Sequence, residues 1–156
     1  MAWEPTIADL ERYLGGAHVL RTLCDPNRTG QTDQAIAQGY VDAGVAETRE
    51  RVEVKHAPET IESLDAVSTQ RVRDAALACA ARIAYERGAQ GQAMPPKVAD
   101  AAQRPDAWLT DLAEGTRRLG RAAGGKVAAL NQPAKIVDPD PKGEGISRAG
   151  FARGFT

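Results

Sequence analysis

Apolar residues in the first 24 positions recur at the three- and four-residue spacing of an amphipathic helix. Thr6 is a favourable N-cap, and Asp9 three residues later completes the pattern of a capping box. We therefore expect a first helix that follows Thr6 and ends at the Gly15-Gly16 pair. A second, short helix is expected over residues 17–24. The polar segment 25–30 contains Pro and Gly and predicts a loop.

A third helix is expected over residues 33–52, with Thr32 as its N-cap. Gly39 and Gly44 lie inside it, and each costs about 1 kcal/mol relative to alanine. Close packing against another helix would explain both glycines. The segment 53–58 is a connector in which Val52 and Val54 alternate with charged residues, so a short extended stretch is a second possibility there.

The longest regular pattern follows a short helix that is expected from Pro58 to residue 64 or 65. Ser68 or Thr69 is the expected N-cap of this longest helix, which continues to Arg87 and stops at Gly88. Its apolar residues form two rows rather than one. Two apolar rows indicate burial on more than one side, as in the centre of a bundle.

The pattern weakens after the long helix. Residues 97–103 could form two helical turns, and Pro105 suits the first position of a last helix that reaches Leu119. Residues 124–156 contain six glycines and three prolines and show no helical period. The predicted fold is all-α, a small bundle of five to six helices around one long central helix. It comprises a helical domain over residues 1–123 and an extended C-terminal tail over residues 124–156.

Composition changes this picture in three ways. Of the 156 residues 42% are apolar but only 4% aromatic, which predicts a thin, alanine-rich core whose apolar surface is completed by neighbouring subunits. The net charge of −1 argues against nucleic acid as the main ligand. Cys24 and Cys79 lie on apolar helical faces and are expected to be buried free thiols. Neither a signal peptide nor a membrane-spanning segment is expected.

The residues that could carry chemistry do not form a convincing site. The segment 120–126 matches G-x-x-x-x-G-K, but Val127 stands where a phosphate-binding loop needs Ser or Thr. His18 and His56 have no partner at a metal-ligand spacing. We therefore expect no catalytic, cofactor or metal site and no enzymatic activity. The charged groups at 47–53 and 71–74 are interpreted as solvated helix ends.

Two groups of residues remain as candidates for contact with partners. Arg117, Arg118 and Arg121 form a basic cluster that could face a channel or a neighbouring subunit, and DNA-backbone contact is an alternative interpretation. Both phenylalanines of the chain lie in the tail, which favours a docking strand over an unstructured terminus. The expected partner-binding residues of the tail are Ile136, Val137, Phe151, Arg153 and Phe155.

The order of elements resembles the head–tail adaptor (connector) proteins of tailed phages, of the Mu-like type. That family begins with the pattern T-x-x-D-L-x-x-x-x-G, and this chain has it from Thr6 through Asp9 and Leu10 to Gly15. The resemblance covers roughly residues 5–127. It continues through Leu20-Arg-Thr-Leu23-Cys24-Asp25, the Asp-led helix from Asp33, the alanine-rich stretch 74–85 and Gly125-Lys126-Val127. The turn after the third helix departs from the family pattern, and the tail is longer.

The resemblance implies a structural role. Such adaptors form a homo-oligomeric ring, commonly of twelve copies, beneath the portal protein. A C-terminal segment reaches the portal, and the opposite face receives a tail or stopper protein. The implied location is the neck of the virion, after assembly in the host cytoplasm, with DNA only as passing cargo and no membrane contact. A small helical DNA-binding module that uses the basic cluster is the alternative, and an enzyme ranks last.

Overall fold

The computed structural model describes residues 3–88 and 93–120. Six helices and no strand lie within these residues, which confirms the predicted all-α class. The helices are α1 (Ile7–Leu14), α2 (Ala17–Leu23), α3 (Gln34–Glu53), α4 (Pro58–Glu62), α5 (Ala66–Gly88) and α6 (Pro96–Glu114).

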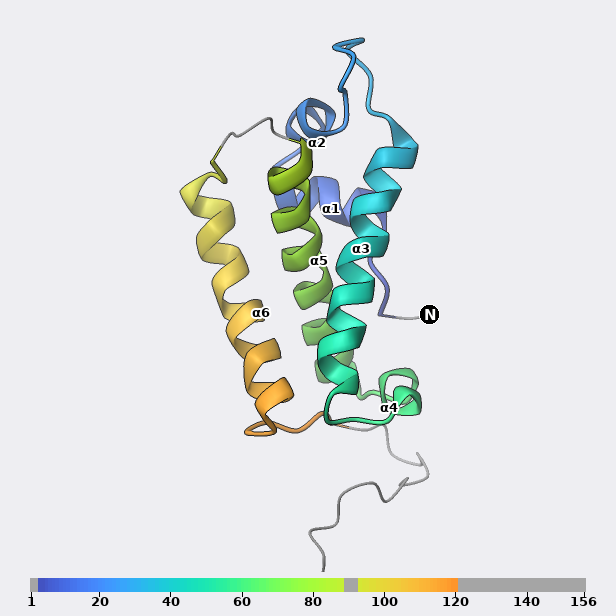
Figure 1. Cartoon of the computed structure of the whole chain (residues 1–156), viewed down its shortest axis with the longest axis vertical. Helices are drawn as coiled ribbons and strands as arrows, with labels where there is room; N and C mark the ends of the chain where they lie inside the picture. Colours follow the sequence, from blue (N-terminus) through green and yellow to red (C-terminus); the bar gives the residue numbers. More distant parts are fainter. Residues whose placement is uncertain (1–2, 89–92, 121–156) are drawn as a thin grey trace, which may run out of the picture.

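The three long helices α3, α5 and α6 lie side by side, with α5 between the other two (Figure 1). Helices α1 and α2 pack against α5 towards one end of the bundle, and α4 lies at the other end beside the end of α3 (Figure 1). Twelve of the 23 residues of α5 are buried. The two apolar rows of this helix therefore predicted its central position correctly.

Two hydrophobic clusters fill the bundle, one towards each end. The first cluster joins α1 and α2 to the N-terminal half of α3 and the C-terminal half of α5, with Leu10, Leu20 and Val41 almost fully buried. The second joins the other halves of α3 and α5 to α4 and α6, with Ile61, Leu109 and Leu112 at its centre. Both α3 and α5 contribute to both clusters, so these two helices connect them.

The two clusters are closed by the chain's own helices. Among the described residues, the large apolar side chains that stand out into solvent are Val54 and Val67, each 61% exposed. Whether neighbouring subunits cover further apolar surface stays a prediction. Alanines at the helix contacts allow the helices to approach closely, so a few large side chains are enough to fill the space between them.

Several element boundaries differ from those predicted. Asp33, not Thr32, is the N-cap of α3, because its carboxylate accepts hydrogen bonds from the backbone N–H groups of Ala35 and Ile36. Helix α5 begins at Ala66, ahead of the expected caps at Ser68 and Thr69, since the carboxylate of Asp65 accepts from the N–H of Ser68. Val52 belongs to α3, so the extended stretch considered at 52–54 does not form.

Helix α6 is one continuous helix, where a break before Pro105 was expected. Proline inside a helix removes one N–H donor and crowds the carbonyl four residues earlier. The buried side chains Val98, Trp108, Leu109 and Leu112 lie on both sides of this proline and hold the two parts of the helix against the bundle. The helix ends at Glu114 and not at Leu119, and its C-cap, Gly115, has a left-handed φ of 79°.

The two glycines inside α3 have different surroundings. A Cβ added to Gly44 would lie 2.5 Å from the carbonyl oxygen of Ala76 and 2.8 Å from the Cβ of Ala80. A Cβ added to Gly39 would meet nothing within 4 Å. The predicted close helix contact therefore exists at Gly44 and not at Gly39.

Candidate partner-binding surface

The described part of the basic cluster lies just after α6, in the segment that closes the bundle. The Nε–H of Arg117 donates to Oδ2 of Asp111 at 2.7 Å, and the side chain of Arg118 is exposed. Arg121 lies outside the described residues, as does Lys126 of the G-x-x-x-x-G-K segment. The structure therefore pairs one of the three predicted contact arginines with a carboxylate of its own chain.

The end of this segment is fastened to the start of α5. The N–H of Gly120 donates to Oγ of Ser68 at 2.9 Å, and its carbonyl accepts from the N–H of Asp65 at 3.1 Å. A Cβ at Gly120 would overlap the carboxylate of Asp65, and Leu119 is buried in the second hydrophobic cluster. These contacts fix the point from which the remaining 36 residues, 121–156, continue.

The tail residues expected to bind a partner lie outside the residues that the structure describes. They are Ile136, Val137, Phe151, Arg153 and Phe155.

Arg117 also lines a shallow cleft of about 420 Å³ between α5 and α6. Arg71 and Arg104 border the same cleft, together with Asp74, Asp111 and the ring of Trp108. Because two carboxylates stand among the three guanidinium groups, this surface has mixed charge. It suits a polar contact with a protein better than the uniform contact that a nucleic-acid backbone requires.

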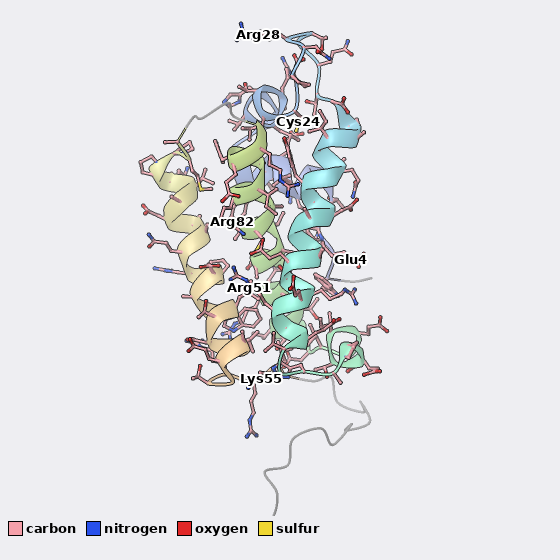
Figure 2. All side chains as sticks on the ribbon, viewed as in Figure 1. Glu4, Cys24, Arg28, Arg51, Lys55 and Arg82 are labelled. Atoms are coloured by element: carbon pink, nitrogen blue, oxygen red, sulfur yellow. The ribbon has the colours of Figure 1, made fainter. Side chains whose placement is uncertain are left out.

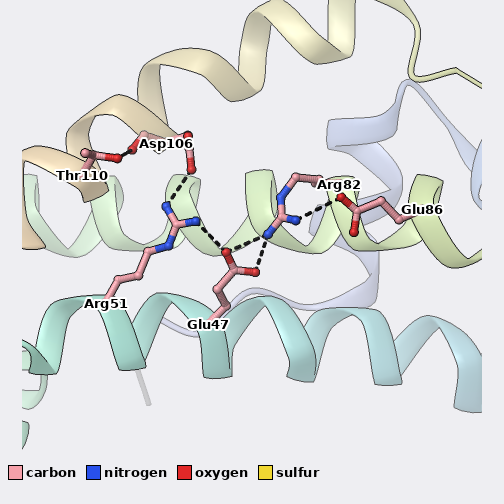
Figure 3. A network of polar contacts seen from close by, with 6 residues as sticks. All are labelled: Glu47, Arg51, Arg82, Glu86, Asp106 and Thr110. Atoms are coloured by element: carbon pink, nitrogen blue, oxygen red, sulfur yellow. Dashed lines mark hydrogen bonds and ion pairs between the residues drawn. The ribbon is translucent and has the colours of Figure 1, made fainter.

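A charged network connects α3, α5 and α6, as Figure 3 shows. Glu47 of α3 accepts from Arg51 at 2.9 Å and from Arg82 of α5 at 2.5 Å, and Arg51 also donates to Asp106 of α6 at 2.7 Å. Arg82 donates to Glu86 at 3.0 Å. The prediction that the charges at 47–53 form a merely solvated helix end is thus wrong for Glu47 and Arg51.

A second ion pair crosses from α5 to α1. Arg73 donates to Oδ2 of Asp9 at 2.6 Å, and the same oxygen accepts the N–H and the hydroxyl of Thr6. These hydrogen bonds from Thr6, followed by that from Arg73, hold the pKa of Asp9 well below its usual value. The interpretation of Arg73 as part of a solvated helix start is therefore wrong, because spacing along the chain does not indicate that Asp9 lies opposite it.

Both cysteines are free and buried, as predicted. Burial raises the pKa of Cys24 to about 11 and also raises the pKa of Cys79. Both groups therefore remain neutral thiols at pH 7, which disfavours nucleophilic chemistry. Over residues 3–88 and 93–120, no group of three or more His, Cys, Asp or Glu side chains is placed to hold a metal ion.

In the same ranges, no helix has the length and apolar character needed to cross a membrane. Comparisons with protein-family models, with curated proteins and with solved structures found no match to this chain.

Proposed function

We propose that this protein is a structural head–tail adaptor of a tailed phage or phage-like particle. Copies of the chain form a ring beneath the portal and connect it to the tail, in the neck of a virion assembled in the host cytoplasm. The role is mechanical and not catalytic. The proposed partners are the portal protein, a tail or stopper protein and sister copies of the chain, with DNA as passing cargo.

The observation that carries this proposal is the structural use of the T-x-x-D-L-x-x-x-x-G pattern. Thr6 caps α1, Asp9 closes the capping box and binds Arg73, and Leu10 is fully buried. Gly15 ends the helix with a φ of 99°. Every fixed letter of the motif on which the resemblance depends therefore has a folding role.

The surface of the bundle supports contacts that are mainly polar. Among the described residues, the large apolar side chains that are exposed are Val54 and Val67, so further apolar anchors for a partner are sought in the tail. The tail contains such residues, among them Phe151 and Phe155. An extended segment advances about 3.3 Å per residue, so the tail could span tens of ångströms. Repetition of a modest contact around a ring gives high avidity.

The proposal is tested by deleting residues 131–156 and measuring binding to immobilised portal rings. We expect the truncated protein to bind at least about tenfold more weakly, because each copy loses its apolar anchors. A full-length F151A/F155A variant separates the anchors from the length of the tail. Circular dichroism should show unchanged helix content in both variants. Undiminished binding by the truncated protein would contradict the proposal.

The DNA-binding alternative is less well supported, because Arg117 is paired with Asp111. It predicts binding to a DNA duplex that weakens steeply as salt concentration rises. A titration at two salt concentrations tests it, and the adaptor proposal predicts no such binding in the micromolar range.

A further inference from the structure

A cleft of about 600 Å³ opens at the end of the bundle where α1 and α2 lie. The 25–30 loop, the C-terminal turns of α2 and α5, and the N-terminal half of α3 enclose it. Arg28 lies at the tip of this loop, at the opposite end of the molecule from Lys55, as Figure 2 shows. A cleft of this volume can accept several side chains of a bound peptide.

Three arginines from separate segments border the cleft: Arg21 from α2, Arg28 from the loop and Arg87 from α5. All three side chains are exposed, and none forms an ion pair with a carboxylate in the described part of the chain. Arg21 and Arg87 lie in the last turns of their helices. Each of these two helix C-termini carries about half a negative charge. Together with the carboxylate of Asp25 this does not cancel the three positive guanidinium groups, so the cleft is positive.

The acidic residue of the cleft, Asp25, is already used within the loop. Its carboxylate accepts the N–H of Thr29 at 2.8 Å and the N–H of Gly30 at 2.6 Å. These hydrogen bonds lower its pKa, so it stays ionised and bound to the loop. They also hold the loop in the conformation that gives Arg28 a φ of 55°, which non-glycine residues adopt uncommonly. The loop thus presents the Arg28 guanidinium from a constrained backbone.

Apolar groups form the wall behind the arginines. Leu23, Ile36 and Tyr40 line the cleft; Leu23 and Tyr40 are largely buried and Ile36 is partly exposed. The Tyr40 hydroxyl donates to the carbonyl of Leu23 at 3.4 Å. A uniform polyanion such as DNA would leave this apolar wall without a complement. A peptide that alternates acidic and apolar side chains would use both the wall and the arginines.

We propose that this cleft binds an acidic peptide segment of a partner protein, with carboxylates on Arg21, Arg28 and Arg87 and an apolar side chain against Ile36 and Tyr40. The contact depends on the adaptor proposal only for the partner's identity, a tail or stopper protein. Gly120, where the chain continues into the tail, lies at the opposite end of the bundle (Figure 1). The two docking elements would then serve the two sides of the ring.

The test uses the full chain and two fluorescein-labelled hexapeptides, one of four glutamates and two leucines, the other with glutamine in place of each glutamate. Binding is followed by fluorescence anisotropy at low salt, with a hexathymidine oligonucleotide as a third probe. The variant R21Q/R28Q/R87Q removes the three cleft charges. The charge-matched control R12Q/K55Q/K97Q changes three exposed cations that lie outside this cleft.

We expect the glutamate peptide to bind the unmodified chain and the control variant with affinities within about twofold. Binding to R21Q/R28Q/R87Q should be about tenfold weaker, and the glutamine peptide should bind as weakly. Absence of glutamate-peptide binding, equal loss in both variants, or tighter binding of the oligonucleotide would overturn the proposal. Deletion of residues 131–156 should leave peptide affinity unchanged even where it abolishes portal binding, so the two proposals can fail separately.

Discussion

Some residues in this protein make contacts that the surrounding sequence does not predict. Asp9 was identified from the sequence as part of a capping box, and it has that role. Its carboxylate also accepts a hydrogen bond from Arg73 of α5, which lies 64 positions later in the chain. A local motif can be identified from spacing because both partners are near in sequence. The second partner of such a residue depends on the fold, and spacing cannot predict it.

The position of Asp9 makes stability depend on pH. Its pKa is lowered in the folded chain from an unfolded value near 3.8, so the ionised form stabilises the fold. This contribution is complete above the unfolded pKa and is lost as pH falls below it towards the folded pKa. We expect Asp9→Asn to reduce the free energy of unfolding by about 1–2 kcal/mol at pH 7, and by about half as much near pH 2.5, where part of the contribution is lost.

Urea denaturation of both proteins at the two pH values measures this difference. Arg12→Gln is the control, because Arg12 is 80% exposed and lies 3.7 Å from Asp9. An exposed pair of that kind contributes less than about 1 kcal/mol. A difference between the Asp9 protein and its Asn variant that does not change with pH would show that the carboxylate charge has no part in the stability.

At the scale of elements, the close contact between α3 and α5 depends on small residues. Gly44 lies against the backbone of α5, and Ala76 and Ala80 face it. Such a contact explains why a chain with few large apolar side chains can still bury them completely. The glycine that makes the contact possible lowers the intrinsic helix propensity of α3.

Opposite effects are expected from one substitution at the two glycines of α3. Gly44→Ala should destabilise the fold by about 1–3 kcal/mol, because the added methyl group would overlap α5. Gly39→Ala should stabilise it by up to about 1 kcal/mol, since the position is exposed and alanine favours the helix. Thermal and urea denaturation of the two variants measure both effects. Equal changes in stability at the two positions would show that α3 and α5 are not in close contact there.

The sequence predicted the helices well and their ends less well. Apolar periodicity located α3 and α5, and the two rows of α5 predicted its central position. The start of a helix depends on which nearby polar side chain caps its free backbone N–H groups. Asp33 and Asp65 cap α3 and α5 in place of the neighbouring Thr and Ser residues. The break expected at Pro105 did not form, because tertiary packing of α6 outweighs the local preference of proline.

The candidate surfaces were predictable only in part. Arg117 and Arg118 were identified because they are adjacent in the sequence. The cleft formed by Arg21, Arg28 and Arg87 was missed, since three distant segments contribute one arginine each. The network around Glu47 was missed for the same reason. Residues that meet only through the packing of helices leave no signal in spacing along one sequence.

At the scale of the whole molecule, the two hydrophobic clusters are joined by helices that run through both. Cys24 lies in the first cluster and Cys79 in the second, so each thiol reports on one of them. Because α3 and α5 belong to both clusters, neither cluster can lose its packing without disturbing the other. We infer that the described bundle unfolds as one cooperative unit.

The reactivity of the two thiols with a disulfide reagent at pH 8 tests this inference. In C79A only Cys24 reacts, and in C24A only Cys79 reacts. Both thiols should be almost unreactive in the absence of urea, because they are buried and their pKa values are raised. In each variant, the urea concentration at half-maximal reactivity should equal the midpoint of helix loss in circular dichroism of that same variant. If one thiol became reactive well before helix loss, its cluster would open on its own, and the helices shared by the two clusters would not couple them.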